Sequence, residues 1–216
     1  MSTSDKAISS SHSSEPAQAE GRYHHGNLRE ALVEAGLGLL ESQASADFSL
    51  RELARQVGVS ANATYRHFAN KEALMAAMAA EGFRRFASAQ QKAYLRESRP
   101  RQRFMAAGHA YVHFARDNPA LFRLMFGPFT ASHRTPEMES AGSVAFAGLC
   151  QGVAAVMELP PEDPHVMAAA LHAWSVAHGL SHLLLDGQLQ HFAGDLETLV
   201  DTALRQVISV PAQQKA

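Results

Sequence analysis

The chain has 216 residues, a formal net charge of −2 and a single cysteine, Cys150. One thiol cannot form an intramolecular disulfide, so the sequence is not that of a disulfide-stabilised secreted domain. Residues 21–103 hold 13 Lys and Arg against 8 Asp and Glu, and residues 104–216 hold 5 against 10, a division that suits either a polyanion-binding first half or two ordinary solvated surfaces.

The first segment, residues 1–21, is rich in serine and lacks an apolar core. This composition predicts a disordered tail and does not match a signal peptide. No continuous apolar run approaches the eighteen or so residues that a membrane span requires. We therefore expect a soluble, cytoplasmic protein without a membrane partner.

The rest of the sequence predicts helices, because strand-like alternation is absent and helix punctuation recurs. The predicted helices begin at good N-cap residues, which are Asn27, Ser49, Ser60, Asn70, Asn118, Thr135 and Asp163. After the last three of these, proline occupies the first helical position. We expect an all-α fold of about nine helices.

Two short helices meet in the sequence SLRELARQVGVSANATYRHF, residues 49–68. Gly58 can adopt the left-handed conformation of a tight turn, and such a turn between two helices is typical of a helix-turn-helix. The first helix offers Leu53 and Val57 to a small core, whereas the second, from Ala61 to Phe68, is mostly polar. A polar helix on a hydrophobic base suits the major groove of DNA. A plain helical hairpin with one solvated helix is the alternative.

Several side chains of this segment match contacts that proteins make with DNA. Asn62 can pair with adenine, and the methyl group of Thr64 can touch a thymine methyl group. Tyr65, His67 and Lys71 can reach phosphates, and the start of the next helix offers free backbone N–H groups. We expect Asn62 and Thr64 to contact bases and Lys71 to bind phosphate.

The stretch SLRELARQVGVSANATYRHFANKEALMAAM resembles the DNA-binding segment of the TetR family of transcriptional regulators. The similarity extends over residues 23–80, and HAWSVAHGLSHLL resembles the Trp-His-Gly region of one branch of that family. By this resemblance, contacts with DNA fall on Arg22, Ser49, Arg51, Ser60, Ala61, Asn62, Thr64, Tyr65, His67 and Lys71. Family members often have glycine near position 62 and leucine or proline at position 64, whereas this sequence has Asn62 and Thr64. This difference leaves the expected fold unchanged but puts the operator sequence in doubt.

The resemblance also implies how the chain is divided. The expected parts are a tail over residues 1–21, a helix-turn-helix domain over 22–75, a ligand-binding and dimerisation domain over 76–210 and a tail over 211–216. Small residues, including Ala173 and Ala177, form one stripe on the helix from Pro164 to Asp186. We expect this stripe and the last helix to form a four-helix homodimer interface, with intrachain packing as the alternative.

Aromatic and methionine side chains concentrate between residues 83 and 174. Such stripes usually fill a core, but a cavity lined by several of them would suit a largely apolar effector. The candidate lining residues are Phe86, Phe104, Tyr111, Phe122, Met125, Phe126, Phe146, Trp174 and His178.

Other chemistry is poorly represented in the sequence. His109 with His113, and His178 with His182, are i,i+4 pairs that could face one metal ion, but neither has a nearby cysteine or an H-E-x-x-H motif. Cys150 lies in an apolar helix, where a thiol is normally inert. We therefore assign no metal ligand, cofactor or catalytic residue. The sequence favours a ligand-responsive repressor that binds a pseudo-palindromic DNA operator as a dimer; the alternative is a small all-α enzyme or carrier with a vestigial helix-turn-helix.

Overall fold

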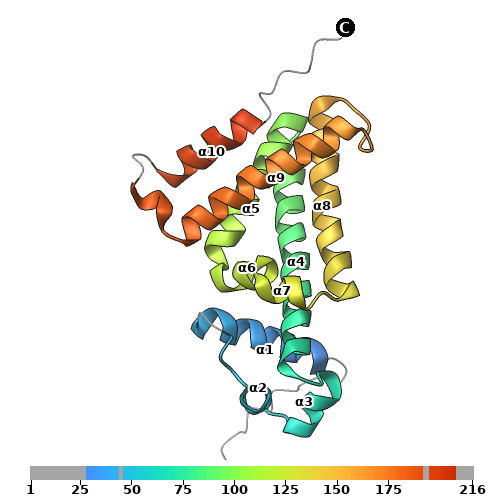
Figure 1. The fold of residues 1–216 in the computed structure, drawn as a ribbon, viewed down its shortest axis with the longest axis vertical. Coiled ribbons are helices and arrows are strands. Elements are labelled where there is room, and N and C mark those ends of the chain that lie inside the picture. The colour runs from blue at the N-terminus through green and yellow to red at the C-terminus, as the bar shows by residue number, and fades with distance from the viewer. Residues whose placement is uncertain (1–27, 44–45, 192–194, 208–216) are drawn as a thin grey trace, which may run out of the picture.

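The computed structural model describes residues 28–43, 46–191 and 195–207, and every regular element within these ranges is helical (Figure 1). In chain order the described helices are α1 (Leu28–Gln43), α2 (Leu50–Val57), α3 (Ala61–His67), α4 (Lys71–Leu95), α5 (Pro100–Asp117), α6 (Pro119–Phe126), α7 (Pro128–Ser132), α8 (Pro136–Met157), α9 (Pro164–Leu185), the 3-10 turn η1 (Gln188–His191) and α10 (Leu196–Val207). The all-α prediction is confirmed. Arg22 and Asn27, named above as a DNA contact and a cap, lie outside the described residues.

Most of these helices begin where N-cap chemistry predicts. The side chains of Ser49, Ser60 and Asn70 each accept a hydrogen bond from the backbone N–H three residues on, at 3.1, 3.2 and 2.8 Å. Thr135 caps α8 in the same way, at 3.3 Å. By contrast, α5 begins at Pro100 without a capping side chain, and this start is not among those predicted.

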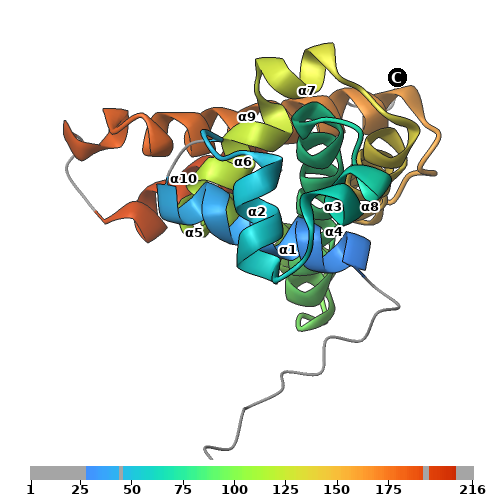
Figure 2. The same cartoon turned by 90° about the horizontal axis from the view of Figure 1, so that it is seen from below.

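The first three helices and the start of α4 enclose a small hydrophobic core. Figure 2 shows the arrangement of these helices from below. Leu32 of α1, Leu53 of α2 and Leu74 of α4 are fully buried in it. Phe48 and Phe68 are buried beside them. This core fixes α3 against α1 and α2, so that one side of α3 faces solvent.

The long helix α4 connects this small domain to the rest of the molecule (Figure 1). It packs against α5 and α8, and α6 crosses it closely. A Cβ atom at Gly82 would lie 2.7 Å from Met125 Sδ, so only glycine allows α6 to approach this closely without a shift. The predicted domain boundary between residues 75 and 76 falls within this continuous helix and stays a prediction.

Polar contacts also join α1 to the C-terminal helices. The backbone N–H of Leu121, at the start of α6, donates a 2.9 Å hydrogen bond to the Glu41 carboxylate of α1. Arg29 of α1 forms a 2.9 Å ion pair with Glu137 at the start of α8. Exposed ion pairs contribute little stability, but the Glu41 carboxylate satisfies an N–H that a helix start leaves unpaired. A displacement of α6 would therefore act directly on α1 through this hydrogen bond.

Candidate functional site

The turn between α2 and α3 has the geometry that Gly58 predicts. Gly58 lies in the left-handed region at φ 76° and ψ 28°, where a side chain would be strained. The backbone N–H groups of Gly58 and Val59 donate to the carbonyls of Arg55 and Ala54, at 3.2 and 2.9 Å. These bonds close the end of α2 and direct the chain into α3.

The solvent side of α3 presents polar and aromatic groups. Asn62, Tyr65 and His67 are exposed, and the Tyr65 side chain is unusual among large aromatic residues in being 46% exposed. Arg66, which is not among the predicted contacts, is exposed on the same helix. Ala61 is half-buried at its start. Side chains that donate and accept hydrogen bonds on an exposed, firmly supported helix can contact base edges and phosphates.

The remaining predicted contacts surround α3. Arg51 is exposed on α2. The hydroxyl groups of Ser49 and Ser60 accept the cap bonds described above, but each keeps its own hydrogen to donate to a phosphate. Lys71, at the start of α4, is half-buried, with its Nζ atom 5.2 Å from the centre of the Phe48 ring. This cation–π contact holds a positive charge beside the free N–H groups of a helix start.

Thr64 does not lie on this surface. Its side chain is 0% exposed, so the prediction that it contacts a base is wrong for this arrangement. The reason is helical periodicity: Ala61, Thr64 and Phe68 fall on the side of α3 that packs against α1 and α2. The buried hydroxyl oxygen also has no hydrogen-bond partner.

The unpaired hydroxyl of Thr64 predicts a stabilising substitution. Thr64→Val keeps the shape of the side chain and removes the unpaired polar group, so it should raise the free energy of unfolding by about 1–2 kcal/mol. Urea denaturation measures this change. Thr202→Val, at an exposed position of α10, is the control and should stay within about 0.5 kcal/mol of wild type. A destabilised Thr64→Val protein would contradict the prediction.

Several predicted ligand-binding residues do come together in the C-terminal domain. The Phe86 ring lies 4.7 Å from Tyr111 and 5.9 Å from Phe126, and Phe122 lies 4.8 Å from Phe126. His178 of α9 lies 4.9 Å from Phe126. We call these five residues the aromatic cluster. Their edge-to-face and tilted contacts fill the space between α4, α5, α6 and α9.

The hydroxyl of Tyr111 connects the aromatic cluster to α9. It lies 2.8 Å from His178 Nδ1 and accepts a 3.2 Å hydrogen bond from Trp174 Nε1. Because the tryptophan N–H can only donate, the hydroxyl hydrogen is available for His178 Nδ1. Burial lowers the pKa of His178, with nearby His182 adding to the effect, and burial raises the pKa of Tyr111. A neutral imidazole and a neutral phenol therefore share this partly buried bond.

The other predicted ligand residues lie around the aromatic cluster. Met125 is buried against α4 near Gly82, and Phe146 of α8 lies 5.9 Å from Trp174. Phe104 is buried near Gly152. The nine predicted ligand-binding residues thus belong either to the packed interior of the C-terminal domain or to the contact between α8 and α9. Their part in ligand binding stays a prediction.

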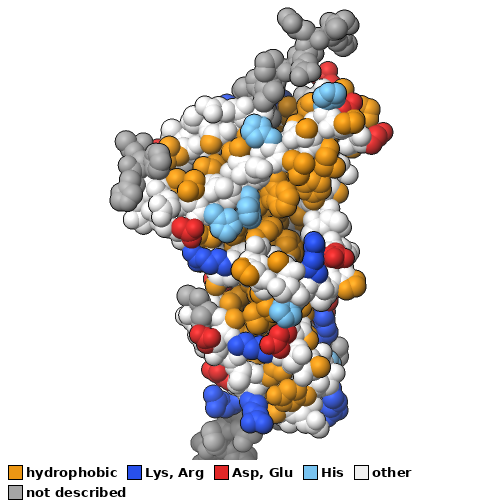
Figure 3. Space-filling view, in the orientation of Figure 1, with side chains coloured by type: hydrophobic (Ala, Val, Ile, Leu, Met, Phe, Trp, Pro, Cys, Tyr) orange, Lys and Arg blue, Asp and Glu red, His pale blue; other side chains and the backbone are white. Residues whose placement is uncertain are grey.

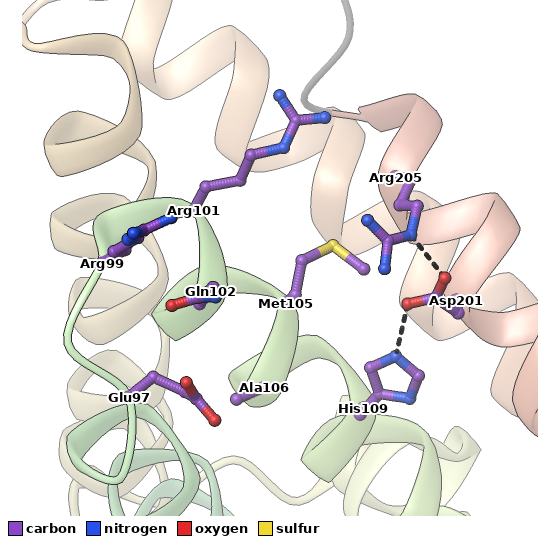
Figure 4. Close-up of a pocket in the computed structure, with 9 residues that line it drawn as sticks. All are labelled: Glu97, Arg99, Arg101, Gln102, Met105, Ala106, His109, Asp201 and Arg205. Atoms are coloured by element: carbon purple, nitrogen blue, oxygen red, sulfur yellow. Dashed lines mark hydrogen bonds and ion pairs between the residues drawn. The ribbon is translucent and has the colours of Figure 1, made fainter.

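A cleft of about 490 Å³ opens elsewhere, between α5 and α10 (Figure 4). None of the nine predicted ligand residues lines it. Its lining residues are Glu97, Arg99, Arg101, Gln102, Met105, Ala106, His109, Asp201 and Arg205. Sequence reasoning missed this site because its two walls are about a hundred positions apart in the chain and no spacing rule relates them.

The predicted dimer stripe of α9 is also placed differently from expectation. Val166, Ala170, Ala173 and Ala177 are buried within the chain, where α9 packs against α5, α8 and α10. The expectation that this small-residue stripe forms a subunit interface is therefore wrong. The bulkier side of α9 faces solvent instead: Leu171 is 46% exposed and Met167 and Trp174 are also exposed. Hydrophobic side chains gather there over α9 and the adjacent part of α8 (Figure 3).

The helix α8 is itself unusually apolar for its exposure. By length and composition alone, α8 could cross a membrane, because its mean hydropathy is 1.5 over an 18-residue window. Polar residues interrupt this window, so it is not a continuous apolar run. The helix begins with Glu137 and Glu139 and packs along α4. Large contiguous apolar patches on a protein surface are a common feature of interaction sites.

Comparison with known proteins relates both halves of the chain to described families. Residues 32–78 match the bacterial regulatory proteins of the tetR family, and residues 104–207 match the tetracyclin repressor-like C-terminal domain. The chain belongs to the TetR family. It is therefore a helix-turn-helix, DNA-binding transcriptional regulator. The more specific likeness to a Trp-His-Gly branch stays a prediction.

Solved structures extend the likeness over most of this TetR-family chain. A protein with unknown function from Rhodococcus sp. RHA1 is 33% identical, with a TM-score of 0.75 over 88% of this chain and 97% of that one. A TetR family transcription regulator from Marinobacter aquaeolei VT8 is 20% identical, with a TM-score of 0.59 over 83% and 93%. The multidrug binding protein EbrR, complexed with imidazole, is 22% identical, with a TM-score of 0.53 over 87% and 98%. The last two share the fold. A search of curated proteins finds no match.

Proposed function

We propose that this TetR-family regulator is a repressor that binds a pseudo-palindromic operator as a homodimer and is released by a small, largely apolar effector. The observation that carries the proposal is the solvent face of α3. Asn62 and Tyr65 are exposed there, on a helix fixed by the left-handed Gly58 and a buried core. A rigid polar helix of this kind suits insertion into the major groove.

The proposed dimer uses exposed apolar side chains of α9 and α8, which we call the α9 face: Met167, Leu171 and Trp174 of α9 and Val144 of α8. A second copy of the chain is the occupant we favour, because a two-fold axis pairs the same apolar patch with itself. The opposite end of the molecule, formed by α1–α3, is then free to meet DNA, with Lys and Arg side chains around it (Figure 3). Two recognition helices, one per subunit, would occupy major grooves about 34–36 Å apart.

The proposed effector site is the aromatic cluster, with the Tyr111, Trp174 and His178 polar groups at its edge. An apolar ligand entering it would displace packed rings and leave these polar groups as the contacts that fix its orientation. EbrR, which shares the fold, is described as a multidrug binding protein. That description supports a small-molecule effector for this chain, though not its identity.

The proposed signal passes through α6. Phe122 and Phe126 of α6 belong to the aromatic cluster, and the start of the same helix is bonded to Glu41 of α1 through the Leu121 N–H. A ligand that moves α6 would therefore move α1 and the recognition helix relative to the α9 face. The distance between the two recognition helices of the dimer would then no longer match the spacing of successive major grooves in DNA.

Effector binding should be weakened by DNA as strongly as DNA binding is weakened by effector. A tenfold loss of DNA affinity requires about 1.4 kcal/mol of coupling, and linkage makes the effect reciprocal. We expect a true effector to change the emission of Trp174, the only tryptophan, because its N–H bonds to Tyr111. Titration of a panel of apolar compounds with and without operator measures both affinities. A compound that binds equally in both cases shifts no equilibrium and is not the effector.

Equilibrium binding to the DNA upstream of its own gene tests the proposed function. Affinity for that DNA should exceed affinity for a scrambled sequence and should fall steeply as salt rises, because Lys and Arg displace counterions from phosphates. Equal affinity for both sequences at all salt concentrations would refute sequence-specific regulation of that site.

A further inference from the structure

A cluster of metal-binding side chains lies beside the cleft between α5 and α10. His109 and His113, one turn apart on α5, meet Glu197 of α10, and the candidate ligand atoms of the three residues lie within 4.8 Å of one another. The sequence alone offered only the two histidines, one turn apart. The fold supplies the carboxylate from a helix more than eighty residues later in the chain.

The distances suit a tetrahedral ion. Glu197 Oε2 lies 3.0 Å from His113 Nε2 and 3.7 Å from His109 Nδ1. Two ligand atoms bound to zinc at ordinary bond lengths are about 3.3 Å apart, which lies between these two values. The imidazole rings are 6.0 Å apart and converge on the same carboxylate. Small side-chain rotations would therefore place all three groups around one ion.

The second nitrogen of His109 has the partner that metal-bound histidines usually have. His109 Nε2 lies 3.4 Å from Asp201 Oδ1, and Asp201 is held in turn by Arg205 at 2.5 Å (Figure 4). A carboxylate that accepts the far N–H of a histidine fixes its tautomer and directs the other nitrogen toward the metal. Asp201 is thus a positioning residue that leaves His109 Nδ1 free to bind.

Arg116 shares the Glu197 carboxylate with the histidines, because its guanidinium lies 3.4 Å from Oε1 and His113 Nε2 lies 2.9 Å from the same oxygen. The other oxygen, Oε2, lies 3.0 Å from His113 Nε2 and 3.7 Å from His109 Nδ1, so Oε2 is the atom that could bind an ion together with both histidines. The other histidine pair provides a contrast within the described residues. His178 is hydrogen-bonded to Tyr111 and lies in the aromatic cluster. Among the described residues, no third histidine, cysteine or carboxylate joins His178 and His182 to form a group of potential metal ligands.

We infer that His109, His113 and Glu197 form a binding site for a divalent transition-metal ion of the zinc class, with water completing the coordination. Two histidines and one carboxylate, with the fourth position open, are a ligand set that zinc accepts. The bound ion would join α5 to α10 at the mouth of the cleft. This inference rests on the side-chain geometry alone and does not depend on the proposed operator or effector.

Cobalt(II) is the probe that tests the site, because a four-coordinate cobalt ion absorbs visible light. The full-length chain, first stripped with a chelator, should bind one Co²⁺ per chain with a tetrahedral-type spectrum that Zn²⁺ displaces. His113→Ala should weaken binding at least tenfold, and Asp201→Asn should weaken it about 10–100-fold by releasing His109. His172→Ala, at an exposed histidine of α9, is the matched control and should bind like wild type.

The folded state of each variant is checked by circular dichroism. If His113→Ala fails to fold, Glu197→Gln replaces it, since the amide keeps the shape of the side chain and should also lose at least tenfold in affinity. Absence of a one-to-one cobalt complex in the wild type would overturn the inference. So would unchanged binding in the folded His113→Ala or Glu197→Gln protein, because the cluster would then be an ion-pair network alone.

Discussion

Leu171→Asp should convert the protein from a dimer to a monomer. The side chain is 46% exposed in the isolated chain, so the substitution should leave the fold of each subunit intact. In the proposed dimer it would bury an unpaired carboxylate in the α9 face, which is strongly unfavourable. We expect the dissociation constant of the dimer to rise at least 100-fold, equivalent to about 3 kcal/mol. Analytical ultracentrifugation across a concentration series measures it.

Leu95→Asp is the matched control for this experiment. Leu95 is an exposed leucine at the end of α4, outside the α9 face, so the same change in charge should leave the dimer intact. Operator affinity should fall with dimerisation in Leu171→Asp and remain near wild type in Leu95→Asp. An intact Leu171→Asp dimer, or a wild type that is monomeric at all concentrations, would contradict the proposed interface. Ala177→Glu is unsuitable here, because Ala177 is buried inside the subunit.

Asn62→Ala should weaken operator binding by about 1–3 kcal/mol and relax the preference at one base pair in each half-site. Asn62 is exposed on α3, and its amide can both donate to and accept from an adenine edge. Lys71→Ala should act differently, because a phosphate contact carries no sequence information. It should weaken all DNA sequences alike and reduce the salt slope by about one. Fluorescence anisotropy with single-base operator variants distinguishes the two outcomes.

Gln91→Ala removes an exposed amide from α4, away from the recognition helix, and controls for the loss of a polar side chain. It should bind every operator variant as the wild type does. A change of base preference in Lys71→Ala together with none in Asn62→Ala would reverse the roles proposed for these residues.

Much of the small N-terminal domain could be predicted from sequence because its signals are local. Ser49, Ser60 and Asn70 cap their helices through backbone groups three residues away, and Gly58 meets a backbone requirement at its own position. Thr64 shows where this reasoning stopped. Its chemistry suits DNA contact, but its position on α3 turns it inward, and a helix of seven residues gives little periodicity from which to infer that.

The C-terminal domain was harder to predict because its decisive contacts are not local. The two faces of α9 differ in side-chain size, and sequence reasoning assigned the small face to a second subunit. The structure uses that face within the chain, since the small side chain of Ala173 allows the neighbouring helices to pack closely. The approach of Glu197 to His109 and His113 likewise depends on how α10 folds back onto α5. No residue spacing in the sequence predicts that α10 packs against α5.

In the proposed dimer, two copies of α3, joined through the α9 face, recognise DNA by sequence. Selection of bound DNA from a random pool by the full-length protein tests it most directly. We predict a pseudo-palindromic consensus whose half-sites are centred about one helical turn, or a multiple of it, apart. Recovery of no consensus, or of a single half-site without a symmetry mate, would contradict recognition of DNA by this dimer.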